Sequence, residues 1–494
     1  MDNTTRSRTF PDNDEANATP PPPEEAAPVY YEGCPGCAME RKVENSTGIP
    51  YKEFVFVGVT SLASALPISS LFPFLYFMIQ DMHVAKNEQD IGVYAGLLGA
   101  SYMAGRFAGS LFWGVVADRV GRKPIIAFSL FTVVILNTLF GLSVNYWMAL
   151  TTRLLLGSLN GMLAPMKAYC VEVCRPEHHA LGLSVLSSAW GIGLVIGPSI
   201  GGYLAQPAKQ YPKLFSENSI FGRFPYFLPC LCISLVALAA LISCIWLPET
   251  LHMHKNLEVE VEMVGDTRLA PRREAPHPEK SLYKNRPLMS SIAAYCVFTL
   301  HDTAYSEIFS LWTVSDKKYG GLGFSSKDVG QVLAVSGAGL LVYQLFIFRH
   351  VHNLLGSVNS LRIASALSIP ILACYPFMTN LSGTKLGLAI YFAAIAKGAL
   401  AMTILTGNAI LQNNAVSQNQ RGAANGLSAT GQSLFKTIAP VGAGVLFSWA
   451  QKRQNATFFP GDQIIFVILN LVELLGLVLS FKPFLSLPKK YDFK

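Results

Sequence analysis

The chain has 494 residues, of which 51% are hydrophobic and only 14% are charged, well below the roughly 25% of charged residues in soluble domains. The net charge of +7 comes from Lys and Arg that lie mainly at the ends of apolar blocks, without the clustered basic face that phosphate contact requires. The composition therefore excludes a soluble globular protein and a nucleic-acid-binding protein. The sequence has no nucleotide-binding loop and no His-Glu-x-x-His pattern, so we expect neither an enzyme nor an ATP-driven pump.

Residues 1–50 are predicted to be a disordered tail, because they lack the apolar mass that would offset the entropy of ordering. Twelve apolar blocks of about 20 residues or more follow, each long enough to cross a hydrocarbon core of about 30 Å. Their approximate limits are 52–79, 91–116, 124–143, 146–168, 180–205, 224–247, 288–314, 327–348, 360–379, 385–411, 422–449 and 463–483.

These blocks predict an all-α membrane protein with twelve transmembrane helices in two six-helix bundles. The expected segments are a cytosolic tail (1–50), a first bundle (51–247), a polar cytosolic linker (248–287), a second bundle (288–485) and a second cytosolic tail (486–494). With this topology Lys and Arg are more frequent on the inner segments, so the positive-inside rule places both termini in the cytosol.

The loop between the second and third blocks, Trp113–Pro124, combines small residues with an acid and several cations. Small residues let two helices approach, and the charges can form charge-assisted hydrogen bonds. The string is similar to the loop signature of major facilitator transporters, which implies a latch that stabilises the outward-facing state. A purely topogenic cationic loop is the alternative. The gating candidates here are Gly114, Asp118, Arg119, Gly121 and Arg122.

The fifth block contains a glycine-rich run with Gly197 and Pro198. Glycines permit close packing, and a proline removes one backbone hydrogen bond, so this helix can bend. The run resembles a signature of the antiporters of the same superfamily, which favours export over uptake. Tight helix packing without a gating role is the alternative reading of the two residues.

The seventh block carries three ionisable residues, His301, Asp302 and Glu307, of which His301 and Asp302 count to near the membrane midplane. Charged groups in hydrocarbon are costly and usually serve a function. Asp302 and Glu307 lie about 140° apart on a helical wheel, so they should not form one coupled pair. We predict Asp302 as the main proton-coupling site, assisted by its neighbours. A structural ion pair between helices is the alternative.

Cations in other blocks are candidate substrate contacts, together with Tyr305. Lys397 and Lys436 count to near the midplane, and Arg106 lies about 12 Å from the inner loop motif. Arg153 begins an Arg-x-x-x-Gly pattern in the fourth block and could instead snorkel to the outer interface. Either lysine could instead simply neutralise Asp302 or Glu307. Glu473 is expected on a protein-facing packing surface and is assigned no role.

Two segments on the predicted inner side could bind a metal ion. Cys34 and Cys37 form a Cys-x-x-Cys motif in the tail, and His252 and His254 lie at the start of the linker. Two thiolates and two imidazoles make a four-coordinate zinc site if the segments meet. Reduced thiols without a ligand are the alternative.

Several strings together resemble the plant zinc-induced facilitator-like transporters of the major facilitator superfamily. The resemblance runs from about residue 33 to the C-terminus, apart from the variable part of the linker. The strings are Cys34-Pro-Gly-Cys37, Ala65–Ser70, Trp113–Pro124, Glu172–Arg175, Pro248–His252, His301–Glu307 and Gln420–Gly426.

The resemblance implies the major facilitator fold and proton-coupled export of a small organic molecule in metal homeostasis. Family members handle nicotianamine or mugineic-acid phytosiderophores, and others are tied to auxin or potassium, so these substrates remain alternatives. A membrane sensor that binds its ligand without transporting it is an alternative function. We expect no cofactor, a proton gradient as energy source, lipid and a small molecule as partners, a monomer, and residence in the plasma or vacuolar membrane.

Overall fold

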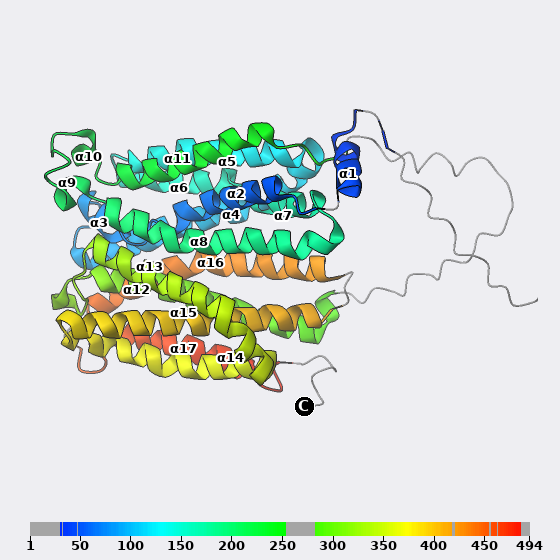
Figure 1. Cartoon of the computed structure of the whole chain (residues 1–494). Helices are drawn as coiled ribbons and strands as arrows, with labels where there is room; N and C mark the ends of the chain where they lie inside the picture. The colour runs from blue at the N-terminus through cyan, green and yellow to red at the C-terminus, as the bar shows by residue number, and fades with distance from the viewer. Residues whose placement is uncertain are drawn as a thin grey trace, which may run out of the picture.

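The computed structural model describes residues 30–31, 33–46, 48–252, 282–416, 420–453, 456–461 and 463–485. Two groups of helices lie against each other, the N-terminal half above and the C-terminal half below in Figure 1. The first half contains α2 (Tyr51–Ser69), α3 (Leu75–Asp81), α4 (Ile91–Val120), α5 (Arg122–Gly141), α6 (Tyr146–Leu159), α7 (Leu163–Glu172), α8 (His179–Leu204) and α11 (Phe227–Ser243). The second contains α12 (Arg286–Val314), α13 (Ser326–Val342), α14 (Phe348–Cys374), α15 (Gly383–Asn414), α16 (Arg421–Gln451) and α17 (Gln463–Leu479). The predicted all-α fold is confirmed.

Local sequence determines where several helices begin and end. Pro73 lies between α2 and α3, where it cannot donate the backbone hydrogen bond that would join them. Gly121 separates α4 from α5 with a φ of 122°, a conformation that side chains disfavour. Ser325 and Asp328 form a reciprocal capping box at the start of α13.

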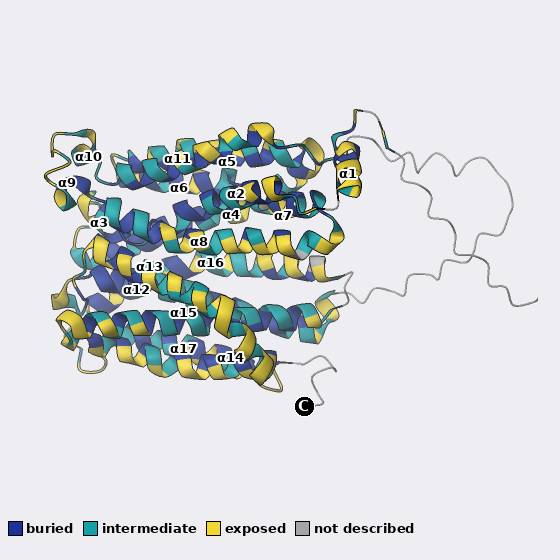
Figure 2. Ribbon diagram, viewed as in Figure 1, coloured by how far each residue is buried: buried dark blue, intermediate teal, exposed yellow. Residues whose placement is uncertain are grey.

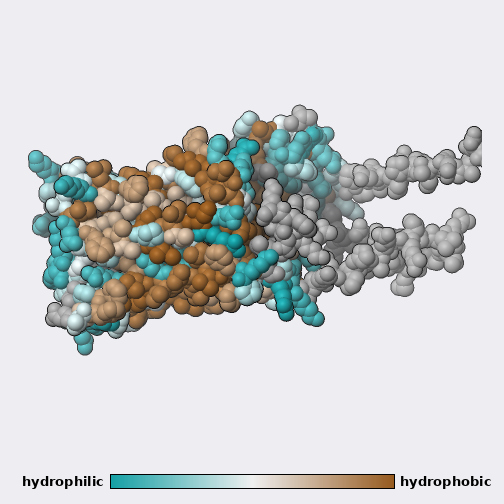
Figure 3. All heavy atoms as spheres, turned by 90° about the horizontal axis from the view of Figure 1, so that it is seen from below, coloured by the Kyte–Doolittle hydropathy of each residue, from teal (hydrophilic) through white to brown (hydrophobic). Residues whose placement is uncertain are grey.

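The outer surface of the helices is apolar. Large side chains such as Phe131, Leu235 and Phe392 are exposed on it, and exposed residues recur along the helix faces that point outward (Figure 2). Figure 3 shows a hydrophobic band between two hydrophilic ends. Such a band is what a bilayer core requires.

Six helical stretches of the described residues are long and apolar enough by themselves to cross a membrane. They cover 122–141, 176–204, 227–246, 326–380, 383–414 and 424–451. Helices also occupy the other predicted blocks. Some of them are interrupted, as α2/α3 and α6/α7 are, and α12 carries buried polar side chains.

The two halves meet along α4 with α16 and along α8 with α13. At one end of the bundle their backbones approach closely, since a Cβ on Gly96 would overlap the carbonyl oxygen of Pro440. The ion pairs Lys318–Glu88 (2.7 Å) and Lys452–Asp90 (2.6 Å) join the halves at the same end. We call this the far end. The opposite end, which holds α1 (Pro35–Asn45) and the segment Pro248–His252, is the linker end.

Helix α1 lies within the predicted disordered tail, so the prediction of disorder was wrong for this segment. Its residues Cys37 and Met39 are buried. Met39 joins the apolar core that also contains Tyr169 and Val173 of the first half. The tail is polar on average, but this one helix has enough apolar contact with the bundle to be ordered.

Candidate functional site

A cavity of about 570 Å³ lies between the two halves. Its wall contains four ionisable side chains: Arg106 of α4, Lys167 of α7, Asp302 of α12 and Lys436 of α16. The far end is closed by the contacts described above. Among the described residues, no ion pair or side-chain hydrogen bond joins the halves at the linker end.

The sequence predicted Arg106, Asp302 and Lys436 as site residues, and the structure brings all three to one cavity. It adds Lys167 and Trp190, which sequence reasoning missed. The guanidinium of Arg106 lies 5.8 Å from the centre of the Trp190 ring, a cation–π distance. Lys167 lies at the edge of an apolar block, where a cation usually indicates topology.

Asp302 lies at the boundary between the cavity and the core of the second half. It lines the main cavity and also a much smaller gap, about 10 Å³, whose wall includes His301, Lys397 and Glu473. No ion pair to Asp302 occurs within the part of the chain that the structure describes. Its carboxylate is therefore half-buried, accessible from the cavity and close to a second group of charges.

That second group is the buried pair His301–Glu473. The two side chains are fully buried, and Nδ1 of His301 lies 2.8 Å from Oε2 of Glu473. The hydroxyl of Ser365 donates a hydrogen bond of 2.8 Å to the other carboxylate oxygen. Lys397 is also buried, and its Nζ lies 5.3 Å from the centre of the Tyr305 ring. A buried charge persists when such partners compensate its desolvation.

The structure gives Glu473 a partner that sequence reasoning had not assigned. His301 had been expected beside Asp302 as part of the proton site, but its ring points to Glu473. Counting helix rise from Gln463 places Glu473 about 15 Å into its helix, near the midplane depth of His301. This equal depth was the signal that could have suggested the pair.

Glu307 lies between the halves, on a different face of α12. It is buried, and a Cβ on Gly99 of α4 would approach its Oε2 to 3.0 Å. Its Oε1 has no hydrogen-bond partner among the described residues. The carboxyl therefore belongs to the closed interface and does not line the main cavity.

Three of the predicted substrate contacts, Arg153, Tyr305 and Lys397, also lie away from the main cavity. Arg153 is buried, donates a 2.7 Å hydrogen bond to the carbonyl of Pro67, and lies 5.3 Å from the centres of the Tyr102 and Phe140 rings. Its burial argues against snorkelling to the outer interface. The hydroxyl of Tyr305 bonds to that of Tyr375 at 2.7 Å. Lys397 lines only the small gap.

The predicted latch lies at the linker end. Arg122 bonds to Asp118 at 2.8 Å and to Glu172 of α7 at 3.1 Å, all within the first half. The Asp118 side chain is 72% exposed, and Arg119 is exposed as well. A Cβ on Gly114 would meet nothing within 4 Å in the described structure. This surface therefore has room for a partner element.

Gly197 and Pro198 lie inside α8. A Cβ on Gly197 would overlap the hydroxyl of Ser69 in α2, so this glycine allows two helices of the first half to touch. The carbonyl of Pro198 lies against Gly330 of α13. The pair thus packs both within the first half and against the second half.

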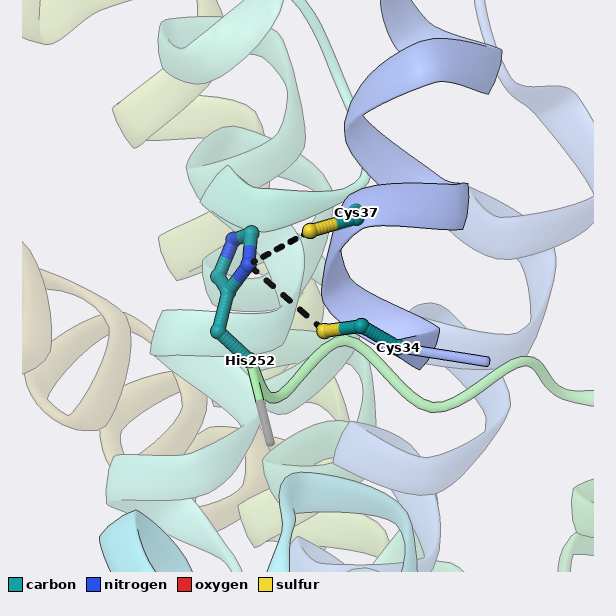
Figure 4. Close-up of side chains that lie close together, drawn as sticks. All are labelled: Cys34, Cys37 and His252. Carbon is teal, nitrogen blue, oxygen red and sulfur yellow. Dashed lines mark hydrogen bonds between the residues drawn. The ribbon is translucent and has the colours of Figure 1, made fainter. Parts of the chain in front are cut away.

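The metal candidates Cys34, Cys37 and His252 meet at the linker end, with the three ligand atoms within 4.8 Å of one another (Figure 4). His254 lies outside the described residues.

Comparison with known proteins agrees with this architecture. The Major Facilitator Superfamily matches residues 57–440. Protein ZINC INDUCED FACILITATOR-LIKE 1 of Arabidopsis thaliana is 53% identical over 461 residues, which cover 92% of this chain and 96% of that protein. Protein ZINC INDUCED FACILITATOR 1 of the same plant is 51% identical over 472 residues, with 93% and 97% coverage.

The solved structure of a bacterial homologue of the human lysosomal transporter Spinster has the same fold. It superposes with a TM-score of 0.64 at 14% identity, covering 88% of this chain and 97% of that one. Fold, family match and relatives agree: the chain belongs to the major facilitator superfamily of membrane transporters and, within it, to the zinc-induced facilitator-like proteins.

Proposed function

We propose that this protein is a proton-coupled antiporter that exports a small organic molecule bearing both carboxylates and amines. Nicotianamine and the mugineic-acid phytosiderophores have this chemistry, and export of such chelators would serve metal homeostasis. The observation that carries the proposal is the position of Asp302. Its carboxylate shares one cavity with Arg106, Lys167 and Lys436 and also borders the gap beside the buried pair His301–Glu473.

The charges of the cavity suit a zwitterion. Three cationic side chains can bind carboxylates, and Arg106 can do so with two parallel hydrogen bonds. Asp302, the one carboxylate among the described lining residues, can bind an ammonium group. Trp190 adds an aromatic face that can pack against the carbon skeleton of the substrate. A purely apolar drug would leave these charges unpaired, which is unfavourable.

Competition between a proton and the substrate amine for Asp302 couples proton influx to substrate export. In the cycle that we propose, Asp302 takes a proton from the acidic side when the cavity opens at the far end. The cavity then opens at the linker end, and the proton leaves for the cytosol. The resulting carboxylate binds the substrate amine, and the next proton displaces it on the other side. Alternating access arises from rocking of the halves about this site.

The proposed orientation places the linker end in the cytosol, so the cavity described here is inward-facing. The latch is then open, as the exposed Asp118 and the free space beside Gly114 suggest. Closure of this end would bring the second half against that surface. The target membrane is the plasma membrane or the vacuolar membrane, each of which has an acidic compartment on its far side.

Transport by purified protein in liposomes tests the function. We impose a pH gradient in which the compartment opposite the cytosolic face is acidic. Under this gradient we expect uphill movement of nicotianamine or deoxymugineic acid into the acidic compartment, and no movement in protein-free vesicles. Auxin and potassium form separate arms of the assay. Movement of either one in place of the chelators would reassign the substrate. Binding of a chelator without counterflow would instead indicate a sensor.

The cationic side chains that line the cavity give a second prediction. Arg106→Ala and Lys436→Ala should each raise the KM for a carboxylate substrate about tenfold or more, because a charge-assisted hydrogen bond contributes roughly 1.5–3 kcal/mol. Lys436→Arg should recover much of the loss. Initial rates over a substrate series measure the effect. Lys209→Ala, at an exposed far-end cation, is the control, and an equal change in that variant would argue against a specific role.

A further inference from the structure

We propose that Cys34, Cys37 and His252 bind one zinc ion, which ties α1 and the start of the linker to the latch loop of the first half. The site is separate from the transport cavity, since none of its residues lines that cavity. It would be a regulatory or structural metal site on the linker end, and its existence does not depend on the identity of the transported molecule.

The distances fit a bound ion. Nδ1 of His252 lies 3.6 Å from Sγ of Cys37 and 4.0 Å from Sγ of Cys34. Ligand atoms around tetrahedral zinc, with Zn–S near 2.3 Å and Zn–N near 2.0 Å, are about 3.6 Å apart. Both sulfurs are buried, and all three side chains converge on one point in Figure 4. All three ligand atoms lie within 4.8 Å of one another, so each pair has to close by at most about 1 Å to reach tetrahedral spacing.

The histidine is also oriented as a zinc ligand would be. Its Nδ1 faces the sulfurs, while Nε2 lies 3.9 Å from Oε2 of Glu40, one turn further along α1. Zinc-bound histidines commonly direct the second ring nitrogen to a carboxylate, which fixes the tautomer and strengthens the ligand. Nδ1 of His252 therefore faces the two sulfurs, and Nε2 lies on the side of the Glu40 carboxylate at a distance longer than a hydrogen bond.

The backbone around the ligands is built for close approach. Gly36 donates its amide hydrogen to the carbonyl of Leu251 at 3.1 Å. A Cβ at position 36 would come within 2.7 Å of the His252 ring, so only glycine fits there. Pro35 occupies the first turn of α1 and starts the helix between the two cysteines. Each residue of Cys-Pro-Gly-Cys thus has a position that serves the cluster.

The chemistry of the ligands selects the metal. Two thiolates and an imidazole favour zinc over magnesium or calcium, which prefer oxygen ligands. The described residues supply three of the four ligands of a tetrahedral zinc site, and His254, the fourth ligand predicted from the sequence, lies outside them. A hollow bordered by Cys34 and Cys37 lies beside the site and provides a route of entry.

The residues just before His252 connect the site to the latch. The Glu249 carboxylate accepts hydrogen bonds from the backbone amides of Arg122 (2.9 Å) and Lys123 (3.0 Å). The hydroxyl of Thr250 donates to Glu172 at 2.6 Å, and Glu172 also binds Arg122. An ion that holds His252 against α1 therefore fixes the segment that supports the turn between α4 and α5.

Metal binding by the purified full-length protein tests the proposal without any transport measurement. After metal has been removed under reducing conditions and zinc has been added back, we expect the protein to bind one equivalent of zinc per chain. With Co²⁺ as probe we expect a thiolate-to-cobalt charge-transfer band. Zinc should raise the melting temperature of the wild-type protein. Cys34→Ser, Cys37→Ser and His252→Ala should each lower the affinity at least tenfold and abolish the thermal shift.

Cys374→Ser, at an exposed cysteine, and His350→Ala, at an exposed histidine, are the matched controls and should keep both signals. Size-exclusion chromatography checks that every variant remains folded. The proposal fails if the reduced wild-type protein binds no stoichiometric zinc, or if binding survives in a variant that combines Cys34→Ser, Cys37→Ser and His252→Ala. It also fails if the two cysteines are found as a disulfide that reduction does not convert into a metal site.

Discussion

Asp302→Asn should lower pH-driven transport at least about a hundredfold while leaving the protein folded in the membrane. The amide keeps the size of the side chain but cannot gain or lose a proton, and it no longer offers a charge to the substrate amine. Asp302 is the one acid among the described residues that line the cavity, so none of those residues can replace it. Flux in liposomes with and without an imposed pH gradient measures the effect.

Two comparisons make the result specific to coupling. Asp316→Asn, at an exposed acid near the far end, should transport like the wild type. Exchange of labelled for unlabelled substrate without a pH gradient should be reduced less in Asp302→Asn than net transport is, because exchange needs no proton movement. Wild-type net flux in the Asp302→Asn variant would refute the role of this carboxylate.

The second large effect concerns the buried pair His301–Glu473. Removing one partner leaves the other group buried without compensation, which typically costs about 3–5 kcal/mol. Glu473→Gln should be more harmful than His301→Ala, because it leaves both His301 and the neighbouring Lys397 without their carboxylate. Thermal unfolding in detergent, followed by fluorescence, should show a large fall in melting temperature for both variants.

A double variant and an exposed pair are the controls. His301→Leu combined with Glu473→Leu should recover part of the lost stability, because two apolar side chains need no compensation. Lys318→Ala, which breaks the half-exposed far-end pair with Glu88, should cost at most about 1 kcal/mol. If the single buried variants unfold like the wild type, the pair does not carry stabilising charge.

The fold followed from the sequence because membrane helices have a strong local signal. Each predicted block is occupied by helix, and breaks fall at Pro73 and Gly121, where backbone chemistry requires them. Arg106, Asp302 and Lys436 were also recognisable, since a charge deep in an apolar block is costly and usually lines a polar cavity. Recognising these three residues needed only the position of each charge along its helix.

The partners of the charges needed information that no single helix contains. Depth did not reveal that His301 faces Glu473 and that Asp302 faces the cavity, because the rotation of each helix is set by its neighbours. The same reason explains why Lys397 and Arg153 fall outside the main cavity. Order in α1 was missed since it depends on Met39 and Cys37 packing against a distant part of the chain.

Helix α12 presents three ionisable groups to three surroundings: His301 to the second half, Asp302 to the cavity and Glu307 to the interface with α4. A tilt of this helix would alter all three surroundings together, so in the proposed proton-coupled cycle the proton affinity of these groups and the position of the two halves would be reciprocally linked. A compound wedged between α12 and α4 would therefore do more than obstruct passage. It would also shift the acidity at which the carrier loads, and a change in the pH optimum would reveal such an inhibitor.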